Sequence, residues 1–218
     1  MSDKSNKYGY VGVDIPAQSF GNNKGVFNPA EINELVADNK WTQYGQLELI
    51  ETQTITSSTS AIDFINLATN PDNVYFLTIN GLTSTLDTRA VIVQLSNNNG
   101  STFITSGYQY AHQVCKANGT FTEEKSTSAG HLVTFAGIGN ATNEVSNGYC
   151  YLYNLLDSSK YSFATQHSSG LESASVLEGR FGSGVLPTAE THNAIRIREN
   201  VSTDFDNAVV SLYGIRYS

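Results

Sequence analysis

The chain is short of charged residues and of cysteine, and each shortage argues against a class of protein. Lys and Arg number 12 against 20 Asp and Glu, so the 218 residues carry a net charge of −8. A surface of that sign repels a phosphate backbone, so we expect no nucleic-acid binding. Only Cys115 and Cys150 could form a disulfide. Both lie in strand-like runs, which favours buried free thiols and leaves one bridge as the alternative.

Long apolar runs are also missing. No run approaches the length that crosses a bilayer, and the N-terminal sequence MSDKSNKYGYVGVD lacks the apolar core of a signal peptide. We therefore expect no membrane insertion and no export by the usual signal route.

The most informative stretch that is present runs from Tyr149 to His167. Residues 149–154 alternate tyrosines with other side chains, and a second alternating run covers residues 161–166. A two-residue period is that of a strand, and the polar residues 157–160 between the runs have the composition of a turn. The stretch therefore predicts a β-hairpin. Both faces of its first strand are aromatic or small and apolar, so that strand should lie inside a sheet.

Further strand-like runs continue from residue 45 to the C-terminus. They recur roughly every ten residues and are separated by Asn, Gly, Pro or Ser, which is typical of an all-β sandwich or barrel. The last run, residues 206–218, carries apolar groups on both faces. We therefore expect it to be an interior strand.

The N-terminal part of the chain has a different pattern. We predict an extended arm and one short helix in residues 1–42, and a β-domain in residues 43–218. Asn28 and Pro29 are a suitable N-cap and first helical residue for a helix over residues 27–38. The arm is more apolar than a free tail needs, so it should pack on a neighbouring subunit or another protein. The expected anchoring or interface residues are Tyr8, Tyr10, Val11, Phe20, Phe27, Ile32, Leu35 and Trp41.

No catalytic motif stands out. Glu123 and Glu124 are adjacent on what looks like a polar loop and should point apart, unlike the acid pair of a glycosidase. The stretch Gly182-Ser183-Gly184 lacks the spacing of a nucleophile elbow and is predicted to be a loop. We therefore predict a protein that is not an enzyme, with no catalytic residue and no bound cofactor.

Histidines and tyrosines are the remaining candidates. None of the histidines has the local spacing of metal ligands, so no metal site is predicted, although a zinc site assembled across strands stays open. The 12 tyrosines could stack on sugar rings, but we favour the alternative that most fill the core or a subunit interface. The four histidines are His112, His131, His167 and His192.

Several phrases in the chain resemble one known family. They are Gly9-Tyr10-Val11-Gly12, Gly25-Val26-Phe27, Lys40-Trp41, LELIETQT, YQYA, YLYNLLDSSKYSFATQHSS and the ending SLYGIRYS. Together these are similar to the small virion structural proteins of marine tailed bacteriophages, which serve as capsid decoration, fibre or appendage proteins. The resemblance covers nearly the whole length.

The resemblance implies a jelly-roll-like antiparallel β-sandwich that forms a homotrimer. It also implies a virion protein that is assembled in the host cytoplasm and held to phage capsid or tail proteins by its N-terminal arm. We expect this non-enzymatic structural role. The alternative is an adhesin whose tyrosines and Asn/Asp loops bind host-surface glycans, and a depolymerase is the weakest reading.

Overall fold

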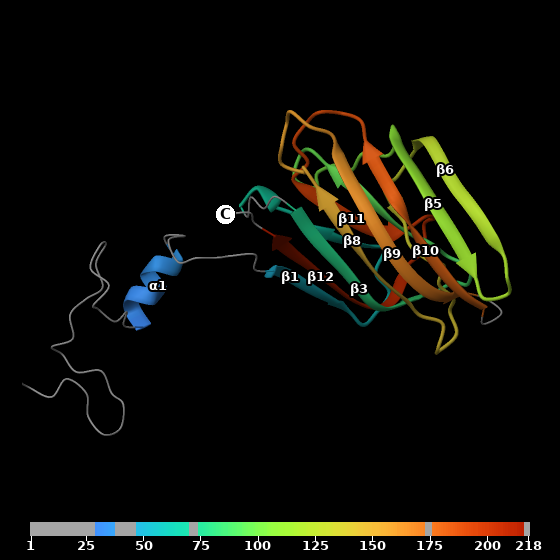
Figure 1. Ribbon diagram of the computed structural model, residues 1–218. Helices are drawn as coiled ribbons and strands as arrows, with labels where there is room; N and C mark the ends of the chain where they lie inside the picture. The colour runs from blue at the N-terminus through green and yellow to red at the C-terminus, as the bar shows by residue number, and fades with distance from the viewer. Residues whose placement is uncertain (1–28, 38–46, 70–73, 173–175, 216–218) are drawn as a thin grey trace, which may run out of the picture. The chain divides into compact units, whose positions relative to one another are not determined.

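The computed structural model describes residues 29–37, 47–69, 74–172 and 176–215 (Figure 1). The chain divides into two units, and Gly45–Tyr217 forms the second. The predicted boundary between residues 42 and 43 lies outside the described residues, and the two units are described separately below.

The predicted short helix is present as α1 (Pro29–Ala37), so Pro29 occupies its first position. Proline suits that position because the first helical N–H has no intrahelical partner. Ile32 and Leu35 are half-buried and Val36 is exposed. No side chain of α1 is fully buried, as expected of a short amphipathic helix with one narrow apolar stripe.

The second unit is built from two antiparallel sheets. The large sheet contains, from edge to edge, β1 (Leu47–Ile55), β12 (Phe205–Ile215), β3 (Val74–Ser84), β8 (Ser146–Tyr153), β9 (Ser162–Glu172), β10 (Val176–Leu186), β5 (Tyr108–Lys116) and β6 (Phe121–Ala129). The small sheet contains β2 (Ala61–Phe64), β11 (Ala194–Glu199), β4 (Val91–Ser96) and β7 (Val133–Thr134). Figure 1 shows the large sheet running across the domain from β12 and β3 to β5 and β6.

The strand order is that of a jelly roll with two added hairpins. Without β5–β6 and β9–β10, the sheets are β1-β12-β3-β8 and β2-β11-β4-β7. Numbered along the chain as 1 to 8, these strands pair as 1-8-3-6 and 2-7-4-5, the arrangement of a double Greek key. The two hairpins extend the large sheet beyond β8. The predicted jelly-roll-like β-sandwich is therefore confirmed.

The hydrophobic core lies between the small sheet and the jelly-roll half of the large sheet. Alternation along each strand sends every second side chain inward. Tyr75 and Leu77 of β3, Leu212 of β12 and Ile195 of β11 are fully buried there. As predicted, the last strand is interior, because β12 pairs with β1 on one side and β3 on the other.

The added strands are covered on their inner side by residues 130–139, which we call the covering segment. Backbone N–H groups of Leu132 and Phe135 bond to Val93 and Val91 of β4, which holds the segment on the edge of the small sheet. On its other side the segment approaches the large sheet so closely that only glycine fits at position 184. A Cβ on Gly184 would overlap the Leu132 carbonyl oxygen.

That contact corrects the prediction of a loop at Gly182-Ser183-Gly184, which lies inside β10. The glycines there allow another backbone to come near rather than the chain to turn. Strand β6 also corrects a prediction, because Glu123 and Glu124 lie on this strand and not on a loop. Cys115 and Cys150 are free, as predicted, but Cys115 is half-buried rather than buried.

Removing most of β12 should unfold the domain. A chain that ends at Asn207 loses Val210 and Leu212, both fully buried, and leaves the edges of β1 and β3 unpaired. We expect no cooperative thermal transition by circular dichroism. A soluble product that melts cooperatively would contradict the interior position of β12.

Gly184→Ala should lower the free energy of unfolding by about 3 kcal/mol, because backbone atoms of the covering segment must move. Gly179→Ala, on the same strand, is the matched control. Its added Cβ would meet only the Cys115 carbonyl oxygen at 3.9 Å, so the change should stay within about 0.5 kcal/mol. Urea unfolding measures both values, and equal losses would contradict the close approach.

Candidate functional site

The large sheet has an open aromatic side that faces away from the core. Along β8, Cys150 and Leu152 are 0% exposed and point inward, so Tyr149, Tyr151 and Tyr153 point outward. Tyr149 is 40% exposed. The predicted hairpin is confirmed, since β8 pairs with β9 and lies inside the sheet.

Strand register gathers further rings on this side. Phe76 on β3 lies opposite Tyr151, His167 on β9 lies opposite Tyr149, and Phe181 on β10 lies opposite His167. Directly opposed residues of an antiparallel pair share a face. We call the resulting set the outer aromatic face: Phe76, Tyr149, Tyr151, Tyr153, Phe163, His167, Phe181 and Tyr213.

These rings support one another. The Phe76 ring centroid lies 4.7 Å from that of Tyr151 and 5.9 Å from that of Tyr149. His167 stands edge-on between Tyr149 and Phe181, with centroid distances of 5.9 and 6.2 Å. Aromatic pairs in such geometries attract each other beyond simple burial. The surface is therefore largely formed before any partner arrives.

Two hollows open between residues of this side. One of about 390 Å³ is lined by side chains of β3, β8 and β9, with Phe76, Tyr149 and His167 among them. The other, of about 560 Å³, involves β9, β10, β5 and β6, with Phe163 and Val185 among its residues. Both volumes fall in the range of small-molecule sites.

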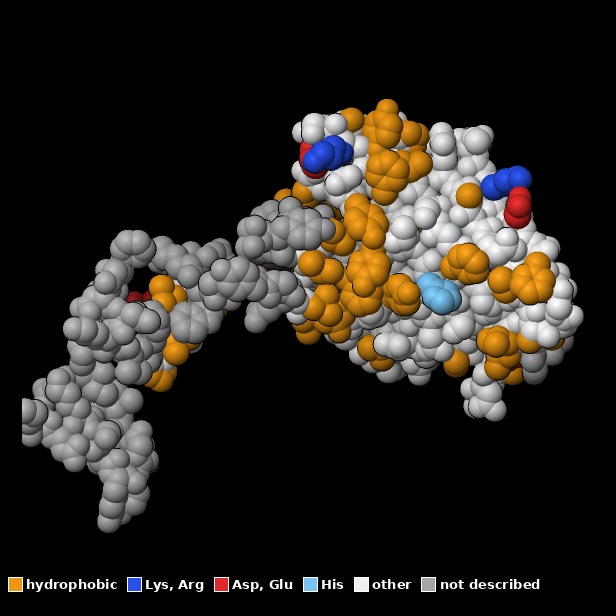
Figure 2. Space-filling view, in the orientation of Figure 1, with side chains coloured by type: hydrophobic (Ala, Val, Ile, Leu, Met, Phe, Trp, Pro, Cys, Tyr) orange, Lys and Arg blue, Asp and Glu red, His pale blue; other side chains and the backbone are white. Residues whose placement is uncertain are grey.

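Charge on this side is sparse and paired. Lys125 binds Glu123 at 2.9 Å, and Lys160 binds Asp157 at 2.7 Å. Figure 2 shows hydrophobic side chains spread across the face, with the charged ones near its margins. The aromatic rings therefore present a largely uncharged surface, bordered by paired charges.

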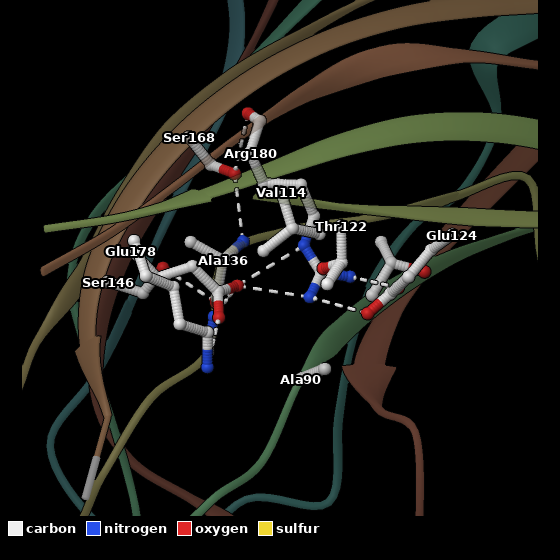
Figure 3. Close-up of polar contacts among 12 residues, drawn as sticks. Ala90, Val114, Thr122, Glu124, Ala136, Ser146, Ser168, Glu178 and Arg180 are labelled. Carbon is white, nitrogen blue, oxygen red and sulfur yellow. Dashed lines mark hydrogen bonds and ion pairs between the residues drawn. The ribbon is translucent and has the colours of Figure 1, made fainter. Parts of the chain in front are cut away.

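On the inner side of the large sheet, buried charged side chains form an ionic network around Arg180 (Figure 3). Arg180 binds Glu124 through two hydrogen bonds of 2.6 and 3.1 Å and also binds Glu178 at 3.0 Å. Lys116 reaches the second oxygen of Glu178 at 3.3 Å. Arg180 and Glu178 are almost fully buried, so each charge needs its partner.

Residues in and next to this network also form hydrogen bonds with backbone groups of the covering segment. The backbone N–H of Gly137 donates to Glu178. The backbone N–H of Ala136 donates to Ser168 (Figure 3). Ser146 donates to the Ala136 carbonyl oxygen. Buried backbone groups require such partners. The arrangement explains Glu178 and Arg180 as structural residues that fasten the covering segment to the added strands.

The predicted divergence of Glu123 and Glu124 is observed. Glu123 lies on the exposed side with Lys125, whereas Glu124 turns inward to Arg180. The lysine beside Glu123 lowers the pKa of its carboxyl group. Neither acid is placed as the proton donor of a glycosidase pair, since both already bind a cation.

Two of the histidines meet at one tyrosine. The Tyr110 ring stacks on His112 at 4.7 Å and on His131 at 5.0 Å. Burial, aided by Arg180, lowers the pKa of His112 from 6.5 to about 3, and burial lowers that of His131 to about 4. In the described part of the chain, no three His, Cys, Asp or Glu side chains gather in a way that could hold a metal ion.

A Ser-His-Glu chain, which the sequence did not reveal, links β9 to the segment before β11. Ser162 Oγ lies 2.7 Å from His192 Nδ1, and His192 Nε2 lies 3.3 Å from Glu190 Oε1. Ser162 and His192 are 0% exposed, so a substrate has no access to the hydroxyl. These two contacts therefore link β9 to the segment before β11 and have a structural role.

Of the predicted anchoring residues, only Ile32 and Leu35 lie in the described part of the chain, where both are half-buried on α1. Tyr8, Tyr10, Val11, Phe20, Phe27 and Trp41 lie outside the described residues. Among the described tyrosines, only Tyr75 and Tyr108 are fully buried, so the core does not hold most of them, and their place in a subunit interface stays a prediction. The tyrosines of β8 instead line the outer aromatic face.

The fold and its site define a class: a jelly-roll β-sandwich with an enlarged sheet and an open aromatic face. No protein-family model matches the chain, and the comparisons with curated proteins and with solved structures give no match either. No helix among the described residues is long and apolar enough to cross a membrane.

His112 should make the protein sensitive to acid. Both its ring nitrogens are buried without a hydrogen-bond partner among the described residues, so the folded state resists its protonation. Because its pKa falls from 6.5 to about 3 on folding, stability is full above pH 6.5 and declines as the pH drops toward 3. The slope from this residue is at most about 1.4 kcal/mol per pH unit.

His112→Phe should reduce that slope and keep stability at pH 7 within about 1 kcal/mol, because an apolar ring can replace the unpaired imidazole against Tyr110. Urea unfolding at several pH values between 7 and 4 measures the effect. An unchanged pH profile in His112→Phe would show that acid acts elsewhere.

Proposed function

We propose that the protein is a non-enzymatic structural protein of a bacteriophage virion. In this proposal the jelly-roll domain is displayed on the particle as a capsid decoration, fibre or appendage, and residues 1–42 anchor it. The observation that carries the proposal is the strand order of residues 47–215, because compact jelly rolls recur in viral capsid domains.

The chemistry of the described residues supports a structural role. Glu124 and Glu178 share the guanidinium of Arg180, and the buried hydroxyl of Ser162 faces His192 out of reach of solvent. These are the polar clusters that could have served as acid, base or nucleophile. Both clusters instead form hydrogen bonds and ion pairs that connect one element of the fold to another.

The thiols support assembly in the host cytoplasm, followed by residence in the virion. Cys115 and Cys150 are both free, as expected where disulfides are kept reduced. Burial raises the pKa of the Cys150 thiol, which keeps it protonated and unreactive. The proposed assembly is a homotrimer that joins phage capsid or tail proteins through the N-terminal arm.

A second candidate function is an adhesin that binds carbohydrate on the host envelope. The outer aromatic face favours it, because exposed rings beside hollows of 390 and 560 Å³ offer stacking surfaces on a pre-formed sheet. In that case the β-domain, and not the N-terminal arm, makes the decisive contact.

Co-sedimentation separates the two functions. Tagged full-length protein and a version that begins at Gln43 are each mixed with phage particles that lack the protein and, separately, with host envelope. If the arm is the anchor, only the full-length protein should pellet with particles, with at least a tenfold loss for the shortened chain.

Circular dichroism of the shortened chain provides the control that its β-domain is folded. Particle binding that survives removal of the arm would contradict the proposed anchor. Pelleting of both versions with host envelope alone would replace the structural role with the adhesin.

A further inference from the structure

The smaller hollow on the outer side of the large sheet has the makings of a ligand site. It has a volume of about 390 Å³ and lies where β3, β8 and β9 run side by side. Its side chains combine rings with amides and hydroxyls. Among them are Phe76, Asn80, Asn147, Tyr149, His167 and Ser169.

A bulge in β3 lies next to the hollow. The register between β3 and β8 shifts between Ile79 and Leu82, where Gly81 adopts a φ of +60°. Glycine takes such an angle without strain, and a bulge redirects the neighbouring side chains. The backbone N–H of Gly81 donates to Asn147 Oδ1 at 2.8 Å. This bond fixes the Asn147 amide across the bulge.

Rings form the apolar part of the hollow. The Tyr149 and Phe76 rings are 5.9 Å apart and inclined at 47°, so they are tilted rather than stacked face to face. His167 supports Tyr149 from the other side at an angle of 72°. A ring that is 40% exposed and held at its edges presents a firm apolar surface to a flat ligand.

Polar groups line the rest. Because Asn147 accepts with Oδ1, its Nδ2 is the end left to donate, and no partner of Nδ2 is found among the described residues. Asn80 and Ser169 are exposed and face the same hollow. Amide and hydroxyl groups next to an aromatic ring match a ligand that has an apolar face and a rim of hydroxyl groups.

Charge decides between neutral and acidic ligands. No Lys, Arg, Asp or Glu is among the described residues that line the hollow. The chain as a whole carries a net charge of −8, which disfavours sulfated, phosphorylated or carboxylated ligands.

We propose that this hollow binds a neutral pyranose unit of a surface glycan, with the Tyr149 ring under the sugar and the Asn147 amide on its hydroxyl groups. A second copy of the chain fits less well, because an apolar subunit interface would bury the amide and hydroxyl groups of Asn80, Asn147 and Ser169 without hydrogen-bond partners. The proposal rests on the second candidate function, a carbohydrate-binding adhesin, and does not depend on whether the N-terminal arm anchors the protein to a particle.

The test uses the full-length protein on an array of immobilised neutral and acidic oligosaccharides, followed by calorimetry with the best neutral binder. Tyr149→Ala should weaken binding at least tenfold, whereas Tyr149→Phe keeps the ring and should stay within threefold of the parent. Asn80→Ala should weaken it severalfold. Phe121→Ala, which removes a 69% exposed ring on the edge strand β6, is the matched control and should have no effect.

Thermal unfolding shows whether each variant is folded. No binding to any neutral glycan, or binding confined to acidic glycans, would overturn the inference. So would binding that survives Tyr149→Ala. Analytical ultracentrifugation covers the remaining case: if Tyr149→Ala dissociates an oligomer and no glycan binds, the face is a subunit interface.

Discussion

The pairing of β8 with β3 on one side and β9 on the other is the interaction on which the domain depends. It joins the jelly-roll strands β1-β12-β3-β8 to the added strands β9-β10-β5-β6 in one continuous sheet. The same ladder places Phe76, Tyr149 and His167 side by side on the outer face. A one-residue slip there would exchange core and surface for the whole of β8.

The large sheet is wider than the small sheet that packs against it, so the inner side of its added strands needs a different cover. The small sheet covers the added strands only through its edge, where residues 130–139, which include its edge strand β7, lie against them. A backbone segment brings polar groups that must be paired. That requirement accounts for the buried serines, glycines and the Arg180 network, where a hydrophobic core would otherwise be expected.

Local pattern predicted much of this fold but little of its site. Alternation between neighbouring residues predicts the β8–β9 hairpin and the interior last strand, and Pro29 marks the start of helix α1. Each of these signals lies within a short stretch of sequence. Strand β6 is not predicted because its residues are mostly polar, like those of a loop. Its Glu124 is held by an ion pair with Arg180, a residue far away in the sequence. The hollow at Phe76 and Tyr149 depends on the register of β3, β8 and β9, and a single sequence does not show which strands pair.

Strand β8 has two faces: Cys150 and Leu152 on the buried one stabilise the fold, whereas the tyrosines on the outer one contribute less to stability. Urea unfolding of full-length Leu152→Ala and Tyr149→Ala, measured in parallel, tests this difference. Leu152 is fully buried, so its loss should cost about 3 kcal/mol. Loss of the Tyr149 ring, which is 40% exposed and contacts Phe76 and His167 only at its edges, should cost half as much or less, at most about 1.5 kcal/mol. Equal losses would mean that the outer aromatic face is part of the structural core, and would contradict the account.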